Sequence, residues 1–145
     1  MSCFVVNKSI RIKATPEKVW NALTNPEKTK KYFFKSEVTS DWKMGSKITF
    51  KGRMFFIIPF KMEGEITKIE SGRLLQYTLK NGKDGDDSSG ISKVTDELTY
   101  VNGETVVNIK DDVGEGKDAA KRYSRSQKGW DKILAGLKKV VEDEQ

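Results

Sequence analysis

The chain of 145 residues contains no histidine, and this absence removes several kinds of chemistry. Nucleophile systems with an imidazole base, zinc sites with histidine ligands and histidine pH switches all need that side chain. The single cysteine, Cys3, cannot form an internal disulfide or a multi-thiolate metal site, and without an imidazole nearby we expect an inert thiol. Any catalysis would have to rest on Asp, Glu, Tyr or Lys. We expect no catalytic residues, no cofactor and no metal.

Long hydrophobic runs are also absent. No apolar run reaches the roughly 18 residues of a membrane-spanning helix, and the N-terminus lacks both a signal-peptide stretch and a myristoylation sequence. We therefore expect a cytoplasmic protein. The length fits one domain of about 100 to 200 residues, so residues 1–145 are predicted to form a single domain. Seven Phe, four Tyr and three Trp supply large apolar side chains for its core.

The net charge of +6 conceals larger local imbalances. Residues 28–61 hold nine basic and two acidic side chains (+7), residues 117–139 hold eight and two (+6), and residues 62–116 hold six and twelve (−6). Basic surfaces attract nucleic acid, but no recognition helix, aromatic stacking sheet or glycine-rich phosphate loop accompanies this one. We therefore expect no nucleic-acid partner.

Proline and alternation patterns divide the N-terminal third into a strand and two short helices. Apolar residues alternate over residues 3–13, with Lys8 as the exception, which predicts a half-buried strand. Thr15 then caps a helix whose first residue is Pro16. The same pattern of a capping residue followed by proline, at Asn25-Pro26, predicts a second helix that ends at residues 32–34.

The rest of the chain predicts strands and one long helix. Strands are expected around Ile48 and Phe50 and over residues 62–70, 74–80, 91–101 and 104–111, the last two forming a hairpin across Asn102-Gly103. From about Lys117, apolar residues recur every three or four positions through Val141. This order predicts an α+β fold in which a curved, mostly antiparallel sheet wraps around the long C-terminal helix.

At this point the sequence resembles a known family. It is similar to the activator of 90-kDa heat-shock-protein ATPase homologue-like family, within the START-like (SRPBCC), birch-pollen-allergen-like superfamily with its helix-grip fold. The likeness spans nearly the whole chain and rests on ATPEKVWNALTNPEK (residues 14–28), GSKITF (45–50), GEI (64–66), LQY (75–77), VTDEL (94–98), GET (103–105) and GWDKIL (129–134). These motifs are specific for the fold, because the proline-initiated helix and the terminal helix occur in the right order and separation.

The resemblance implies less about function than about fold, because this superfamily hosts carriers, receptors, cyclases and co-chaperone domains. The eukaryotic co-chaperones that named the family carry an additional N-terminal domain and linker, for which this chain has no room. Tyr32 stands where the family often places a tryptophan. We therefore do not expect a co-chaperone role.

Proteins with this fold bind ligands in a cavity between the sheet and the terminal helix. Strand parity directs a set of mostly apolar side chains toward that space, and the helix stripe adds three more. The candidate cavity residues are Ile48, Phe50, Met62, Tyr77, Leu79, Val94, Asp96, Leu98, Val107, Ile109, Trp130, Leu134 and Leu137. Each of them would serve equally as plain core.

Asp96 is the most informative of these residues, because it falls in the middle of an otherwise apolar strand face formed by Val94, Leu98 and Tyr100. A buried carboxylate needs a partner or a raised pKa. We interpret Asp96 as a polar anchor or general base in the cavity, the alternative being a salt bridge or a bulge that exposes it.

Two further segments suggest surface roles. The apolar run from Met54 to Phe60, interrupted by Pro59, lies among Lys47, Lys51, Arg53 and Lys61, which suggests contact with an anionic membrane surface. Packing in the core or at the cavity mouth would explain the same run. The acidic stretch from Asp84 to Ser89 lacks the glycine and glutamate of a calcium loop and is expected to be a solvated hairpin loop.

The sequence thus predicts non-enzymatic binding of a hydrophobic or amphipathic, lipid-like small molecule. One alternative is a cyclase- or hydratase-type enzyme in which Asp96 works with Tyr77 or Tyr100. Another is a protein-interaction domain, which a cavity filled by side chains would favour.

Overall fold

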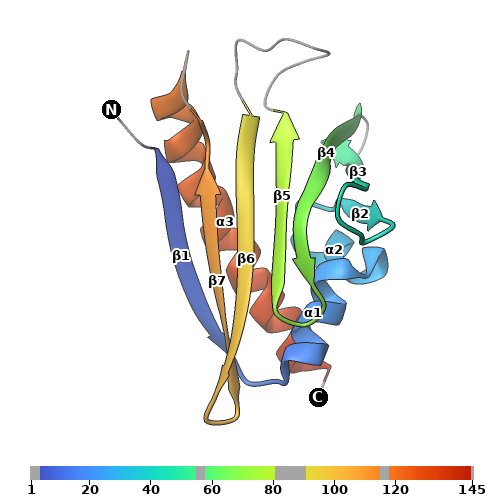
Figure 1. Cartoon of the computed structure of the whole chain (residues 1–145), viewed down its shortest axis with the longest axis vertical. Helices are drawn as coiled ribbons and strands as arrows, with labels where there is room; N and C mark the ends of the chain where they lie inside the picture. Colours follow the sequence, from blue (N-terminus) through green and yellow to red (C-terminus); the bar gives the residue numbers. More distant parts are fainter. Residues whose placement is uncertain (1–3, 55–57, 81–90, 115–117, 145) are drawn as a thin grey trace.

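The computed structural model describes residues 4–54, 58–80, 91–114 and 118–144. Within these residues, one sheet holds seven strands in the order β1-β7-β6-β5-β4-β3-β2, and every neighbouring pair is antiparallel. Helix α3 lies along one face of the sheet, with α1 and α2 next to its C-terminal half (Figure 1). The elements are β1 (Val5–Ile12), α1 (Pro16–Thr24), α2 (Pro26–Tyr32), β2 (Glu37–Ser40), β3 (Lys47–Met54), β4 (Ile58–Glu70), β5 (Leu74–Lys80), β6 (Ile91–Val101), β7 (Glu104–Asp112) and α3 (Ala119–Asp143). The predicted helix-grip fold is confirmed.

Both short helices begin at a proline, as predicted. Asn25 precedes α2, and its side-chain oxygen accepts a hydrogen bond of 3.0 Å from the backbone N–H of Glu27. Thr15 occupies the same position before α1 but makes no side-chain cap bond. The N–H of Lys18 donates instead to the carbonyl of Thr15, so this donor is satisfied by the backbone.

Strand β1 alternates as predicted and buries Val6 and Ile12 against the helix side of the sheet. Lys8 lies on the same inward face. Its Nζ donates to Asp131 Oδ1 of α3 at 2.7 Å, which explains how a lysine is accommodated there.

The hairpin between β6 and β7 turns at Asn102 and Gly103, whose φ angles are 51° and 82°. Two consecutive left-handed residues are the signature of the tight turn that Asn-Gly favours. The turn fixes the register in which Asp96 faces Ile109 and Val94 faces Asp111.

Two features differ from the prediction or go beyond it. The short strand β2 was not predicted, because four residues carry little alternation. The run from Met54 to Phe60 forms the end of β3 and the start of β4, and its residues 55–57 lie outside the described residues. Pro59 lies where β4 pairs only with β3, as expected for a residue that lacks an N–H. Cys3 and the acidic stretch from Asp84 to Ser89 also lie outside the described residues.

Candidate functional site

The concave face of the sheet and the apolar face of α3 enclose a small cavity. Its volume is about 20 Å³, which is close to the space that one water molecule needs. Fifteen residues line it: Leu23, Tyr32, Phe33, Val38, Ile48, Phe50, Leu75, Tyr77, Asp96, Val107, Ile109, Trp130, Ile133, Leu134 and Leu137. All but Asp96 are apolar or aromatic.

The structure brings most of the predicted residues to this cavity. Nine line it: Ile48, Phe50, Tyr77, Asp96, Val107, Ile109, Trp130, Leu134 and Leu137. Val94 and Leu98 are buried in the surrounding core, and Leu79 is half-buried at its edge. Strand parity therefore assigned the inward face correctly in these strands, although it does not say which inward residues meet a cavity.

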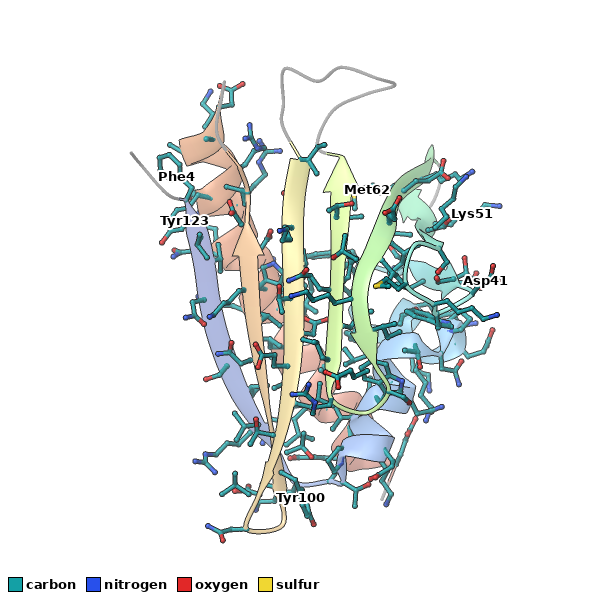
Figure 2. The ribbon with its side chains drawn as sticks, in the orientation of Figure 1. Phe4, Asp41, Lys51, Met62, Tyr100 and Tyr123 are labelled. Carbon is teal, nitrogen blue, oxygen red and sulfur yellow. The ribbon has the colours of Figure 1, made fainter. Side chains whose placement is uncertain are left out.

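Met62 and Tyr100 are corrections, because both are exposed. Met62 pairs with Phe50 and so shares its face of the sheet, yet 37% of it is accessible to solvent. Among the described residues Met62 has no paired residue on β5, because the β4–β5 pairing begins at Gly64, and Tyr100 lies next to the β6–β7 turn with 53% exposed (Figure 2). Strand parity predicts the face of the sheet on which a side chain lies, but not how far along the strand the packed core extends. Here β4 and β6 both continue beyond the packed core.

Six lining residues were missed, for different reasons. Leu75 shares the parity of Tyr77, and Ile133 widens the stripe on α3, so both had a usable signal. Val38 belongs to the unpredicted strand β2. The others, Leu23, Tyr32 and Phe33, come from α1 and the end of α2, where the sequence does not tell which aromatic residue turns inward.

Asp96 is buried in this apolar surrounding. Only 4% of the residue is accessible, its strand neighbours are Leu75 and Ile109, and its Oδ1 has no hydrogen-bond partner among the described residues. Burial, with the nearby charge of Asp111, raises the pKa of Asp96 to about 7. The interpretation of Asp96 as exposed by a bulge or held in a salt bridge does not fit this geometry.

Asp111 is a second buried carboxyl, on the neighbouring strand β7. Its Oδ2 accepts hydrogen bonds from Trp130 Nε1 at 2.9 Å and from the Ser126 hydroxyl, whereas its Oδ1 has no partner among the described residues. Burial raises the pKa of Asp111, and the two hydrogen bonds partly oppose that shift. The parity of Val107 and Ile109 extends to Asp111, so the sequence contained the signal for it.

Aromatic rings form one wall of the cavity, and one of them, Trp130, also donates to Asp111. The ring of Phe33 lies 5.2 Å from that of Phe50 and 5.9 Å from that of Trp130, and Phe50 lies 5.6 Å from Tyr77. Burial, followed by the charge of Asp96, raises the pKa of Tyr77 and of Tyr32 well above the ordinary value. Both tyrosines therefore stay neutral, and the hydroxyl of Tyr32 donates to the carbonyl of Ala22 at 2.7 Å.

Phe33 is held at the cavity by a strained connection. The two residues that follow it, Phe34 and Lys35, have φ angles of 51° and 58°, in the left-handed region that side chains disfavour. Such a conformation costs on the order of 1–2 kcal/mol per residue. The packing of the Phe33 ring among its aromatic neighbours must offset that cost.

A wider depression lies outside the core. This open groove of about 410 Å³ is bordered by Glu17, Trp20, Asn21 and Thr24 of α1 and by Ser71 and Gly72 of the β4–β5 turn.

Among the described residues no group of acidic side chains is arranged to hold a metal ion, and no helix of the described structure is long and apolar enough to cross a membrane.

Known proteins resemble this chain over almost its full length. The family model described as Activator of Hsp90 ATPase homolog 1-like protein matches residues 13–142. A solution structure from Cytophaga hutchinsonii is 32% identical, with a TM-score of 0.76 over 99% of this chain and 98% of that one. None of the curated proteins matches the chain.

Two more distant structures share the fold. A crystal structure from Mesorhizobium loti is 20% identical, with a TM-score of 0.80 over 97% of this chain and 98% of that one. The solution structure of the Aha1 dimer from Colwellia psychrerythraea is 22% identical, with a TM-score of 0.73 over 95% of this chain and 96% of that one. At this identity the likeness supports the fold alone.

Proposed function

Since the chain belongs to the Activator of Hsp90 ATPase homolog 1-like family, we propose that it binds a hydrophobic or amphipathic small molecule between the sheet and α3, without catalysing a reaction. The observation that carries this proposal is the cavity itself, in which an apolar lining surrounds a carboxyl oxygen, Asp96 Oδ1, that has no partner in the described part of the chain. Burying a carboxyl without a partner costs free energy. A core that served stability alone would be better packed without Asp96, whereas a binding site uses such a group to orient its ligand.

The ligand would take the place of the Phe33 ring. The cavity of about 20 Å³ is too small for an alkyl chain, so a side chain must move aside. Phe33 is half-buried and is followed by two residues in strained conformations, so it is the side chain that we expect to move. Its withdrawal would release that strain and open space next to Phe50 and Trp130.

Titration with 1-octanol, a neutral amphiphile, tests this proposal in wild type and in the variants Phe33→Ala and Phe34→Ala. Removing the Phe33 ring enlarges the cavity and removes the cost of displacing it, so F33A should bind 1-octanol more tightly than wild type. Phe34 follows Phe33 in the chain but is 52% exposed. F34A is therefore the matched control, and we expect it to keep wild-type affinity. Calorimetry measures the dissociation constants, and circular dichroism checks that each variant folds.

Absence of 1-octanol binding in wild type and in F33A would contradict the proposal, as would an equal gain in F33A and F34A. Native mass spectrometry of the freshly purified protein is a complementary measurement. A co-purified small molecule in wild type would support the proposal and reveal the ligand's mass.

A protein-interaction role is the second candidate, and one observation favours it: the side chains leave only about 20 Å³ of the cavity open. The Colwellia psychrerythraea relative is described as a dimer, which adds self-association to the partners worth testing. Sedimentation of the ligand-free protein over a range of concentrations measures self-association directly. A folded F33A that binds no amphiphile would favour this role.

A further inference from the structure

We propose that the cavity selects ligands whose head group is an organic ammonium, bound by Asp96, whose Oδ1 has no partner among the described residues, and by the surrounding aromatic rings. The inference deepens the proposed function and rests on it. Four observations support it: an acceptor without a partner among the described residues, a second carboxyl diagonal to it on the adjacent strand, an aromatic wall and the size of the open space.

Asp96 supplies the acceptor. The residue is 4% accessible and lines the cavity, and its Oδ1 accepts no hydrogen bond from the described residues. None of the fifteen lining residues is basic, so within the described structure the protein itself provides no cation for it. A ligand ammonium would supply both the missing donor and the missing opposite charge.

Asp111 determines the sign of charge that the site accepts. Asp96 pairs with Ile109, and Asp111 lies two residues farther along β7 on the same face, as a diagonal neighbour whose carboxyl is held by Trp130 and Ser126. Two neighbouring carboxyls in a low-dielectric surrounding repel an anionic head group and attract a cationic one. A fatty-acid carboxylate would therefore meet repulsion where an alkylammonium meets attraction.

The aromatic wall favours the same chemistry. The rings of Phe50, Tyr77 and Trp130 all line the cavity, and Phe50 and Tyr77 lie 5.6 Å apart. Because the face of an aromatic ring carries partial negative charge, rings of this kind attract ammonium groups, most strongly where water is excluded.

The size of the open space matches the head group rather than the whole ligand. A primary ammonium group is about as large as a water molecule, and the cavity of about 20 Å³ holds about one. The head group would occupy this space next to Asp96. The alkyl chain would extend to the position of Phe33, 5.9 Å from the Trp130 ring.

The net charge of the protein helps to distinguish binding in the cavity from nonspecific binding at the surface. With a charge of +6, the surface as a whole attracts anions and repels cations. Nonspecific binding would therefore favour octanoate over octylammonium, which is the opposite of the order expected for the cavity.

The experiment compares three probes with the same chain, octylammonium, 1-octanol and octanoate, by calorimetry at pH 8. Wild type and F33A should bind octylammonium most tightly and octanoate most weakly. Asp96→Asn keeps the size of the side chain and removes its charge, so D96N should lose roughly tenfold or more in affinity for octylammonium. It should bind 1-octanol about as wild type does.

Two further variants separate local from general effects. Glu97→Gln removes the same charge from an exposed position on the same strand and should leave all three affinities unchanged. Asp111→Asn should reduce the preference for octylammonium over octanoate while the cavity lining stays intact.

The outcomes are distinguishable. If 1-octanol binds and octylammonium binds no more tightly, or if D96N and E97Q behave alike, the ammonium inference is overturned and the proposed function stands. If none of the three probes binds to wild type or F33A, both are overturned.

Discussion

At the scale of single residues, the buried carboxyl of Asp96 makes the stability of the protein depend on pH. Its pKa rises from an ordinary value of 3.8 to about 7 in the folded state, because burial and the charge of Asp111 disfavour ionisation. The folded state therefore holds more protons than the unfolded state over this range, so the contribution of Asp96 to stability falls as pH rises. Tyr32, Tyr77 and Asp111 are the other titratable groups that face it.

The variant Asp96→Asn tests this effect. Near pH 4 the wild-type carboxyl is protonated in the folded state, so D96N and wild type should have similar free energies of unfolding. At pH 8 wild type must bury a charge, and D96N should be more stable by a few kcal/mol, at about 1.4 kcal/mol per pKa unit. Urea unfolding at several pH values measures the difference in free energy of unfolding between the two proteins. The lowered pKa values of Glu27, Glu63 and Glu142 make stability rise with pH, but they are common to both proteins and cancel in this difference.

The control for this prediction is Glu97→Gln, which removes a charge from an exposed position on the same strand and should not reproduce the gain of D96N at pH 8. A D96N protein that is no more stable than wild type at pH 8 would contradict the burial of an unpaired charge.

Single residues also show where sequence reasoning reached its limit. Asp96 was predictable, because strand parity alone places it on an apolar face. Asp111 carried the same signal at the end of its strand. Phe33 was not predictable as a lining residue, because its inward direction depends on the left-handed backbone at Phe34 and Lys35, which no local pattern indicates.

At the scale of elements, the close packing of α3 on α2 rests on one glycine. A Cβ added at Gly136 would lie 2.7 Å from Cβ of Tyr32, closer than real side chains approach. A Cβ at Gly129, seven residues earlier in the same helix, would meet only the Phe34 ring at 3.6 Å, an ordinary contact. The two positions therefore form a matched pair.

We expect opposite effects from alanine at these positions. Gly129→Ala should be neutral or stabilising by about 0.5–1 kcal/mol, since alanine favours a helix. Gly136→Ala should destabilise the protein by about 1–3 kcal/mol, because α3 must move away from Tyr32. Urea unfolding of both variants measures this, and equal stabilities would contradict the close approach of the two helices.

Elements were predictable where local chemistry determines them. The prolines at positions 16 and 26 indicated both helix starts, and Asn102-Gly103 indicated the β6–β7 turn. Strand β2 was missed because its four residues pair with β3 at the sheet edge, and that pairing is a long-range property.

At the scale of the whole molecule, charge differs between surface and interior. The chain carries +6, yet two carboxyls among the described residues, Asp96 and Asp111, are buried as diagonal neighbours on the inner face of the sheet. The composition gives the net charge, but it cannot show that Asp96 and Asp111 are neighbours, because the pairing of β6 with β7 brings them together. The proposed ligand chemistry therefore follows from the interior.

The most direct test is the NMR response of the three tryptophan indole N–H groups of ¹⁵N-labelled protein to octylammonium. Trp130 lines the cavity and donates to Asp111, whereas Trp20 borders the open groove and Trp42 lies between β2 and β3. Binding in the cavity should shift the Trp130 signal in wild type, more weakly in D96N, and leave the Trp20 signal in place. A response at Trp20 alone, or at none of the three, would contradict an ammonium ligand between the sheet and α3.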